Sequence, residues 1–205
     1  MFPLYAILDT ALALARGYEP VDLARRFFDG GAKLLQLRAK DVPAGQVLDW
    51  SLAIAEHAAR AGAVFIVNDR ADVALMTGAD GVHAGQEDLP AAAVRRLAPP
   101  PFLIGLSTHT PAQIAAAARE PVDYLAIGPV FGTATKETGY AAVGLDLVGE
   151  ASRNAAGLPA VAIGGITLEN APSVVAVGAS SVAVISDLLA GDPAGRVREY
   201  LRALR

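Results

Sequence analysis

The residues best suited to bind phosphate lie in one short segment, 128–136, which reads Gly-Pro-Val-Phe-Gly-Thr-Ala-Thr-Lys. The segment follows an apolar run at 124–127, where a buried strand is expected to end. Its glycines allow a turn that exposes backbone N–H groups, and Thr133, Thr135 and Lys136 add donors that an anionic oxygen can accept. An ordinary polar loop has a similar composition, so the neighbouring segments must decide between these two interpretations.

A second group of polar side chains occupies alternate positions after another apolar run. Gln36, Arg38 and Lys40 would share one side of an extended strand end, because successive side chains of a strand alternate between faces. Together they offer an amide, a guanidinium and an ammonium to a phosphorylated ligand. The structural alternative is a solvated rim with an ion pair between Arg38 and Asp41.

Two acidic residues follow the next two apolar runs. Asp69 comes directly after Asn68, and Asp88 ends the segment His-Ala-Gly-Gln-Glu-Asp at 83–88. Mg²⁺ binds readily to one or two carboxylates together with water and substrate phosphates, so this pair suffices for a metal site. The alternative is that each aspartate caps the helix that follows it. We favour the metal because Asn68 and the basic group would place phosphate beside it.

Ser107 and His109 suggest nucleophilic catalysis, but no acid that could orient the histidine is evident nearby. We therefore disfavour a hydrolase and interpret Ser107 as a hydrogen-bond donor. His109 is either a proton shuttle or a structural residue.

Two further segments could bind phosphate through the backbone. Gly164 and Gly165 follow an apolar run and permit close approach of an anion, and Ser186 follows Ile185 after the last apolar run. A tight turn is the alternative role of the paired glycines.

The elements that must position these residues are short apolar runs alternating with alanine-rich amphipathic stretches. The expected strands are 4–8, 34–37, 64–67, 81–83, 102–106, 123–127, 160–163 and 182–185. The expected helices are 21–30, 44–61, 71–77, 90–97, 111–118, 146–156, 168–177 and 193–203. Most strands are apolar on both faces, as buried parallel strands require. Eight such units predict an α/β fold, a (β/α)8 TIM barrel, over an open doubly wound sheet.

In such a barrel the functional residues lie at the carboxyl ends of the strands, which is where all the candidates above fall. The length of 205 residues is typical of one domain, so we expect residues 1–205 to form a single barrel domain.

Composition limits the partners. The net charge of −4 and the lack of a basic cluster argue against nucleic-acid binding. No apolar run approaches the roughly 18 residues of a membrane span, and the start of the chain lacks a signal peptide. The chain has no cysteine, which excludes disulfides and permits a reducing cytoplasm. We expect a cytoplasmic protein, and the candidate phosphate-binding residues indicate small phosphorylated substrates. The apolar outer helices could either pack on the strands or form the interface of a homo-oligomer, such as a dimer.

The motifs and their order resemble the thiamine phosphate synthase family over nearly the whole chain. The segments that carry the resemblance are Gln-Leu-Arg-Ala-Lys at 36–40, Asn-Asp-Arg-Ala-Asp-Val-Ala-Leu at 68–75, Gly-Ala-Asp-Gly-Val-His-Ala-Gly-Gln-Glu-Asp-Leu-Pro at 78–90, the segment 128–136, and Ala-Ile-Gly-Gly-Ile-Thr at 162–167. Members of this family are (β/α)8 barrels that join hydroxymethylpyrimidine pyrophosphate to a thiazole phosphate, with Mg²⁺, and release thiamine phosphate and pyrophosphate.

The resemblance also implies roles for individual residues. The pyrimidine and its pyrophosphate would contact Gln36, Arg38, Lys40, Asn68, Ser107 and Lys136, of which Arg38, Lys40, Ser107 and Lys136 would be catalytic. Asp69 and Asp88 would hold Mg²⁺, and Thr133, Thr135, Gly165, Ile185 and Ser186 would bind the thiazole phosphate.

This inventory suits a dissociative reaction. Loss of pyrophosphate leaves a stabilised pyrimidine cation, so catalysis needs positive charge around the leaving group and no enzymic nucleophile. Two alternatives stay open. One is the related thiazole tautomerase, which uses a histidine in the loop that holds His109. The other is a non-catalytic paralogue that binds thiazole phosphate or thiamine phosphate.

Overall fold

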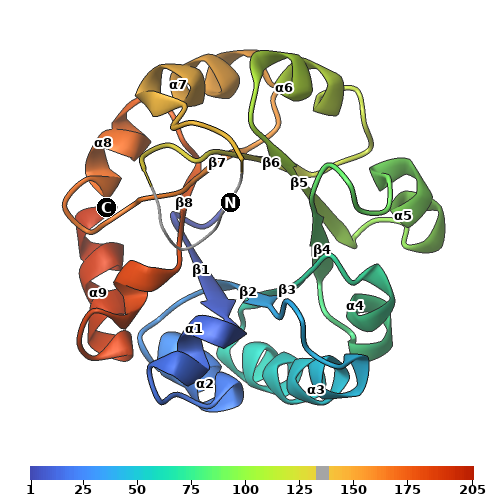
Figure 1. The fold of residues 1–205 in the computed structure, drawn as a ribbon, viewed down its shortest axis with the longest axis vertical. Coiled ribbons are helices and arrows are strands. Elements are labelled where there is room, and N and C mark those ends of the chain that lie inside the picture. The colour runs from blue at the N-terminus through green and yellow to red at the C-terminus, as the bar shows by residue number, and fades with distance from the viewer. Residues whose placement is uncertain (133–138) are drawn as a thin grey trace.

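The computed structural model describes residues 1–132 and 139–205, and eight parallel strands in this part of the chain form a closed barrel (Figure 1). Each strand pairs with its neighbours in sequence, and β8 pairs with β1 to close the ring. The strands are β1 (Leu4–Asp9), β2 (Leu34–Arg38), β3 (Val64–Asn68), β4 (Gly81–Ala84), β5 (Leu103–Thr108), β6 (Tyr124–Ile127), β7 (Ala160–Ile163) and β8 (Ser181–Val184). The predicted (β/α)8 barrel is therefore confirmed, and the open sheet is wrong.

The helices form a ring outside the strands (Figure 1). They are α1 (Thr10–Ala15), α2 (Pro20–Asp29), α3 (Ala44–Ala61), α4 (Ala71–Thr77), α5 (Ala91–Leu97), α6 (Pro111–Ala117), α7 (Gly144–Asn154), α8 (Ala171–Ala176), α9 (Pro193–Ala203) and the 3-10 helix η1 (Ser186–Leu189). Two of them, α1 and η1, were not predicted. Both are too short to show a helical period, and the start of α1 depends on the Asp9 side chain, which accepts a hydrogen bond from the Leu12 N–H.

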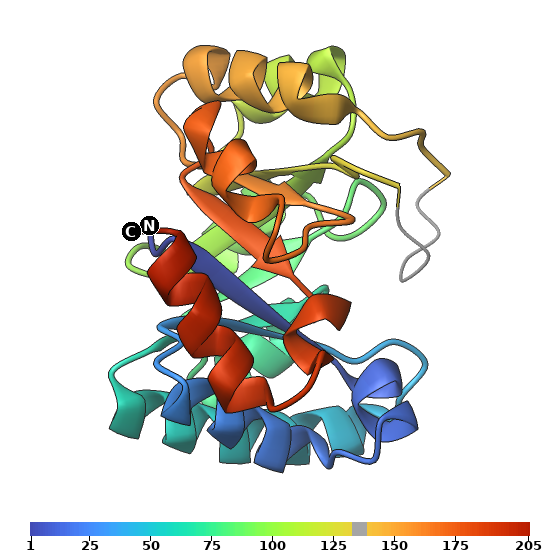
Figure 2. The same ribbon diagram turned by 90° about the vertical axis from the view of Figure 1, so that its left-hand side faces the viewer.

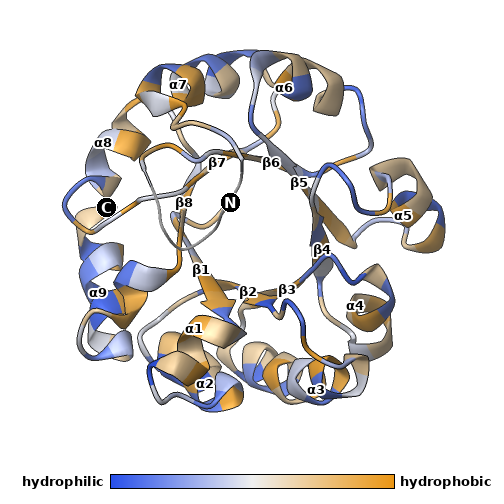
Figure 3. Cartoon of the chain, in the orientation of Figure 1, coloured by the Kyte–Doolittle hydropathy of each residue, from blue (hydrophilic) through white to orange (hydrophobic). Residues whose placement is uncertain are grey.

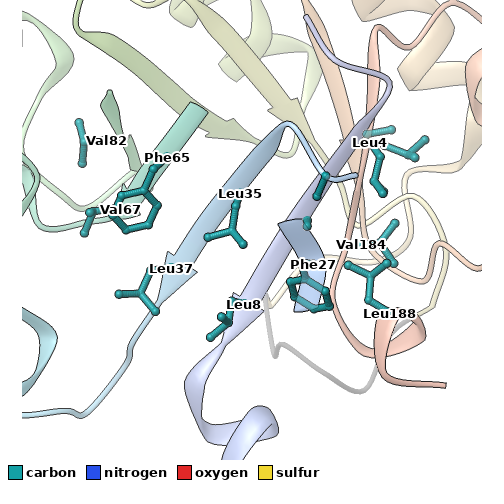
Figure 4. Close-up of a cluster of buried hydrophobic side chains, with 14 of the residues drawn as sticks. Leu4, Leu8, Phe27, Leu35, Leu37, Phe65, Val67, Val82, Val184 and Leu188 are labelled. Atoms are coloured by element: carbon teal, nitrogen blue, oxygen red, sulfur yellow. The ribbon is translucent and has the colours of Figure 1, made fainter. Parts of the chain in front are cut away.

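The strands separate two hydrophobic layers, because their side chains alternate between the outside and the inside of the barrel. Leu8, Leu35 and Leu37 belong to the outer layer, where Phe27 of α2 packs against the sheet (Figure 4). Hydrophilic residues of α9 and α4 face away from this layer (Figure 3). The inner layer fills the barrel with a smaller set of side chains: Tyr5, Ile7, Leu34, Ile66, Tyr124, Ala126, Val161 and Ala183.

The parallel arrangement brings all strand ends of one kind to one end of the barrel. Both chain termini lie at the other end, whereas α1 and η1 lie at the end to which the strands point (Figure 2). Among the described residues, no helix is both long enough and apolar enough to cross a membrane.

One buried hydroxyl in the helical ring makes no hydrogen bond within the described part of the chain. Ser51 of α3 is 0 % exposed, and its Oγ has no partner there. Ser152 of α7 provides a contrast, since its Oγ donates to the carbonyl of Val148 at 2.8 Å.

We expect Ser51→Ala to stabilise the fold relative to Ser152→Ala, by about 1 kcal/mol, because only the second change removes a hydrogen bond. Both substitutions increase helix propensity by the same amount, so the difference between their unfolding free energies reports the contribution of the hydroxyl hydrogen bond. Urea unfolding of the two variants and the wild type measures it. A larger loss of unfolding free energy in Ser51→Ala than in Ser152→Ala would contradict this assignment.

Candidate functional site

A cavity of about 470 Å³ opens at the carboxyl end of the barrel and collects side chains from almost every strand end. The predicted site residues that line it are Gln36, Arg38, Asn68, Ser107, Gly165, Ile185 and Ser186. Lys40, Asp69 and Asp88 do not line this cavity. Thr133, Thr135 and Lys136 lie outside the described residues.

Gln36 and Arg38 point inward from β2, as their alternate positions predicted. Gln36 is buried and donates from Nε2 to the Tyr5 hydroxyl at 2.9 Å. Arg38 pairs with Asp9 at the end of β1, which is the strand beside it. The alternative interpretation, an ion pair between Arg38 and Asp41, is therefore wrong, because the pairing of β1 with β2 puts Asp9 directly opposite Arg38. Asp9 thus serves two purposes, since it also caps α1.

Lys40, Asp69 and Asp88 form a second polar group next to the cavity. Lys40 makes an ion pair with Asp69, which directly follows the cavity residue Asn68. Asp88 Oδ2 accepts a hydrogen bond from the Gly85 N–H at 2.7 Å and lies close enough to Asp69 to interact with it. The acidic pair predicted from the sequence is therefore assembled at adjacent strand ends.

The alternative role of these aspartates as helix caps is not observed. Helix α4 begins after Arg70 and α5 after Pro90, and neither start has a side-chain cap. Burial raises the pKa of Asp88, the Gly85 N–H lowers it, and the neighbouring Asp69 raises it again. Two close carboxylates with such a shift are chemically suited to a divalent cation.

The start of segment 128–136 is anchored to the end of β7. The N–H groups of Val130 and Phe131 donate to the carbonyls of Ile163 and Gly164, at 2.9 and 3.0 Å. Gly164 has a φ of +101°, and a Cβ there would lie 2.6 Å from Pro129 Cα, so only glycine allows this approach. The two loops predicted to share a phosphate are therefore adjacent.

Asp187 joins the loops after β7 and β8. Its Oδ2 accepts from the Leu168 N–H at 3.1 Å, from Arg196 Nη2 at 2.8 Å and from the Tyr200 hydroxyl at 2.5 Å. Ser186, which precedes Asp187, and Gly165 line the cavity, and so does Arg16, which follows α1. Sequence reasoning missed Arg16 because it missed α1.

Sequence reasoning also missed Tyr5 and His83, which line the cavity, and Tyr124, whose hydroxyl contacts both. His83 Nε2 lies 2.9 Å from Ser107 Oγ, and its Nδ1 lies 3.1 Å from the Tyr124 hydroxyl. Each is a polar group within an otherwise apolar strand, and that signal was available in the sequence. What it could not show is that the three strands bring these groups together.

His109 is held by the protein on two sides. Its Nδ1 is 2.6 Å from the carbonyl oxygen of Gly128, and its ring stacks on Tyr140 with centroids 4.2 Å apart. Ser107 bonds to His83 and not to His109, and His83 bonds onward to a tyrosine. In the described residues, therefore, no serine–histidine–acid triad forms, in agreement with the disfavoured hydrolase.

Gly105 provides the space in which His83 and Tyr124 meet. These rings stack with centroids 5.5 Å apart, and a Cβ on Gly105 would lie 2.1 Å from Tyr124 Cζ and 2.5 Å from His83 Nδ1. We expect Gly105→Ala to cost about 1–3 kcal/mol of unfolding free energy through overpacking. The matched control is Gly45→Ala in α3, where a new Cβ meets nothing within 4 Å. Chemical denaturation measures both, and equal stabilities of the two variants would refute the steric argument.

The fold and the site define a (β/α)8-barrel protein with a cavity at the carboxyl ends of its strands, lined by arginine, amide and hydroxyl side chains and by a glycine-rich loop. A family model described as thiamine monophosphate synthase matches residues 4–188. The chain therefore belongs to the thiamine monophosphate synthase family.

Individual relatives agree with this assignment. The chain is 46 % identical over 204 residues to the thiamine-phosphate synthase of Methanoculleus marisnigri, covering 100 % of this chain and 94 % of that protein. It is 45 % identical to a longer thiamine-phosphate synthase of Gloeobacter violaceus, covering 94 % of this chain and 58 % of that protein. Among solved structures, thiamine phosphate pyrophosphorylase from Pyrococcus furiosus superposes with a TM-score of 0.89 at 32 % identity, covering 98 % of this chain and 95 % of the other.

Proposed function

We infer that this protein is a thiamine phosphate synthase, a transferase that joins hydroxymethylpyrimidine pyrophosphate to hydroxyethylthiazole phosphate, or its carboxylated form. The observation that carries the inference is the composition of one cavity in a member of this family. Gln36, Arg38, Asn68 and Ser107 lie on its β2, β3 and β5 walls, and the loops after β7 and β8 form the opposite wall. Its substrates are small phosphorylated molecules, and we propose a cytoplasmic location.

The reaction needs charge and position more than a nucleophile. The bond from the pyrimidine methylene carbon to the pyrophosphate oxygen breaks, and its electron pair leaves with pyrophosphate. The thiazole nitrogen then donates its lone pair to the carbon of the resulting cation. We propose that Arg38, which lines the cavity, and Lys40, which pairs with Asp69 beside it, offset the charge that develops on the leaving group. Thr133, Thr135 and Lys136 keep their proposed phosphate and pyrophosphate roles, although they lie outside the described residues.

The residues present fit a Mg²⁺ ion. Asp69 and Asp88 come from adjacent strand ends and interact as like charges, an arrangement that a divalent cation would relieve. We propose that these two carboxylates hold Mg²⁺ and that Lys40, now paired with Asp69, contacts the pyrophosphate. When bound, the ion would neutralise charge on the departing pyrophosphate.

The direct test supplies both phosphorylated precursors and Mg²⁺ to the purified protein. We expect equimolar thiamine phosphate and pyrophosphate, separated and quantified by chromatography. The absence of product above a protein-free control would overturn the proposed function.

The metal site predicts a change in thermal stability that does not depend on turnover. A ligand that binds only the folded state stabilises it by about 2.7 kcal/mol at about 100 times its Kd, and each kcal/mol shifts the Tm by about 2–4 °C for a chain of this size. Mg²⁺ should therefore raise the Tm of the wild type but not of Asp69→Asn or Asp88→Asn.

Without Mg²⁺, the unfolding free energy should fall as pH rises through the titration of Asp88, because the pKa of Asp88 is raised in the folded state.

Asp72→Asn is the matched control for the Mg²⁺ measurement, since Asp72 is exposed on α4 and pairs with Arg70. It should keep the full Mg²⁺ response. A Mg²⁺ response retained in both site variants would remove these aspartates from the metal site.

The alternative with a specific observation behind it is the thiazole tautomerase, because His109 lines the cavity. It predicts isomerisation of a carboxylated thiazole phosphate without metal, abolished in His109→Ala. The non-catalytic paralogue predicts binding of thiazole phosphate without turnover in either assay.

A further inference from the structure

A chain of hydrogen bonds crosses the inside of the barrel, and four of its five members line the cavity. Gln36 Nε2 lies 2.9 Å from the Tyr5 hydroxyl, which lies 2.9 Å from the Tyr124 hydroxyl. The Tyr124 hydroxyl lies 3.1 Å from His83 Nδ1, and His83 Nε2 lies 2.9 Å from Ser107 Oγ. These five side chains come from β2, β1, β6, β4 and β5, which are five of the eight strands of the barrel wall (Figure 1).

Most members of the chain are buried, even where they line the cavity. Gln36, Tyr5, Tyr124 and His83 are all buried, and the surrounding inner layer is apolar. Burial raises the pKa of both Tyr5 and Tyr124, so both hydroxyls keep their protons at neutral pH. A buried hydroxyl needs a partner, and each of these hydroxyls finds one in the next member of the chain.

The position of each proton in the chain follows from Gln36, whose Nε2 can donate a hydrogen bond but cannot accept one. Tyr5 therefore accepts from Gln36 and must donate its own proton to Tyr124. Tyr124, which now accepts from Tyr5, gives its proton to His83 Nδ1. A neutral His83 then carries its proton on Nε2 and donates it to Ser107 Oγ. The remaining proton, on the Ser107 hydroxyl, is left for the cavity that Ser107 lines.

We propose that Tyr124 and His83 are positioning residues that hold Ser107 as a hydrogen-bond donor toward its substrate. The acceptor would be an oxygen or ring nitrogen of the pyrophosphate-bearing substrate. This proposal rests on the proposed function for the identity of that substrate. The buried residues of the barrel would thus affect the reaction. The direction of the hydrogen bonds, which begins with Gln36 as a donor, determines whether Ser107 presents a proton or a lone pair to the substrate.

The opposite order has different chemistry. If the His83 proton were on Nδ1, then Nε2 would accept the Ser107 proton and leave the serine oxygen as the group facing the substrate. Ser107 would then repel an anionic oxygen instead of binding it. The two orders are distinguished by the tautomer of His83, which can be measured without any turnover.

The first experiment is ¹⁵N NMR of histidine-labelled wild-type protein. The chain contains three histidines, so the His83 signals are assigned by comparison with His57→Gln and His109→Gln. We expect a protonated Nε2 and an unprotonated Nδ1 in His83. A proton on Nδ1 would overturn the proposal, whatever the protein catalyses.

The second experiment tests whether Tyr124 acts through Ser107. Tyr124→Phe removes only the hydroxyl, and its effect on kcat/KM should be a loss of about tenfold, the equivalent of one hydrogen bond of about 1.4 kcal/mol. In a Ser107→Ala background the same change should cause no further loss, since the residue it positions is gone. Tyr18→Phe is the matched control, because Tyr18 lies outside the cavity beneath Arg26 and should keep wild-type activity.

The outcomes separate this proposal from the proposed function. Equal losses from Tyr124→Phe in the wild-type and Ser107→Ala backgrounds would show a merely structural role and overturn the positioning claim. A Tyr124→Phe protein with unchanged kcat/KM would overturn it as well. If the wild type makes no thiamine phosphate, the proposed function fails, whereas the NMR measurement still decides the order of protons.

Discussion

Closure of the parallel sheet is the constraint on which the rest of this structure depends. Once β8 pairs with β1, every strand end of one kind lies on one ring, and every second side chain must point into a narrow interior. Residues as distant in sequence as Ile7 and Val161 then share one inner layer. The pairing of β1 with β2 places Asp9 beside Arg38, which determines where that guanidinium lies.

The narrow interior also determines how polar groups are arranged around the cavity. Gln36, Tyr5, Tyr124 and His83 point inward and are buried, and they form hydrogen bonds with one another. Gly105 supplies the missing side chain that this arrangement needs. The groups that would contact substrate are therefore supported by buried neighbours with fixed orientations, as precise chemistry requires.

The outer loops follow a different principle. Asp187 receives hydrogen bonds from a backbone N–H, an arginine and a tyrosine, and thereby links two loops and α9. Val130 and Phe131 bond to the end of β7 in the same region. Backbone and charge-assisted contacts thus hold the loops after β7 and β8, whereas side-chain hydrogen bonds link the inward-facing residues of the barrel.

The amino-acid sequence by itself determined the barrel, because eight apolar runs alternating with amphipathic stretches leave few other ways to bury both faces of each strand. It also predicted Gln36, Arg38, Asn68, Asp69 and Asp88 as site residues by their type and their position after each run, and the first three line the cavity. Only the tertiary structure decided which groups pair. Asp9 instead of Asp41 neutralises Arg38, and His83 instead of His109 contacts Ser107. The reason is that partners on neighbouring strands are set by sheet register and closure, which bring together residues that no local pattern connects.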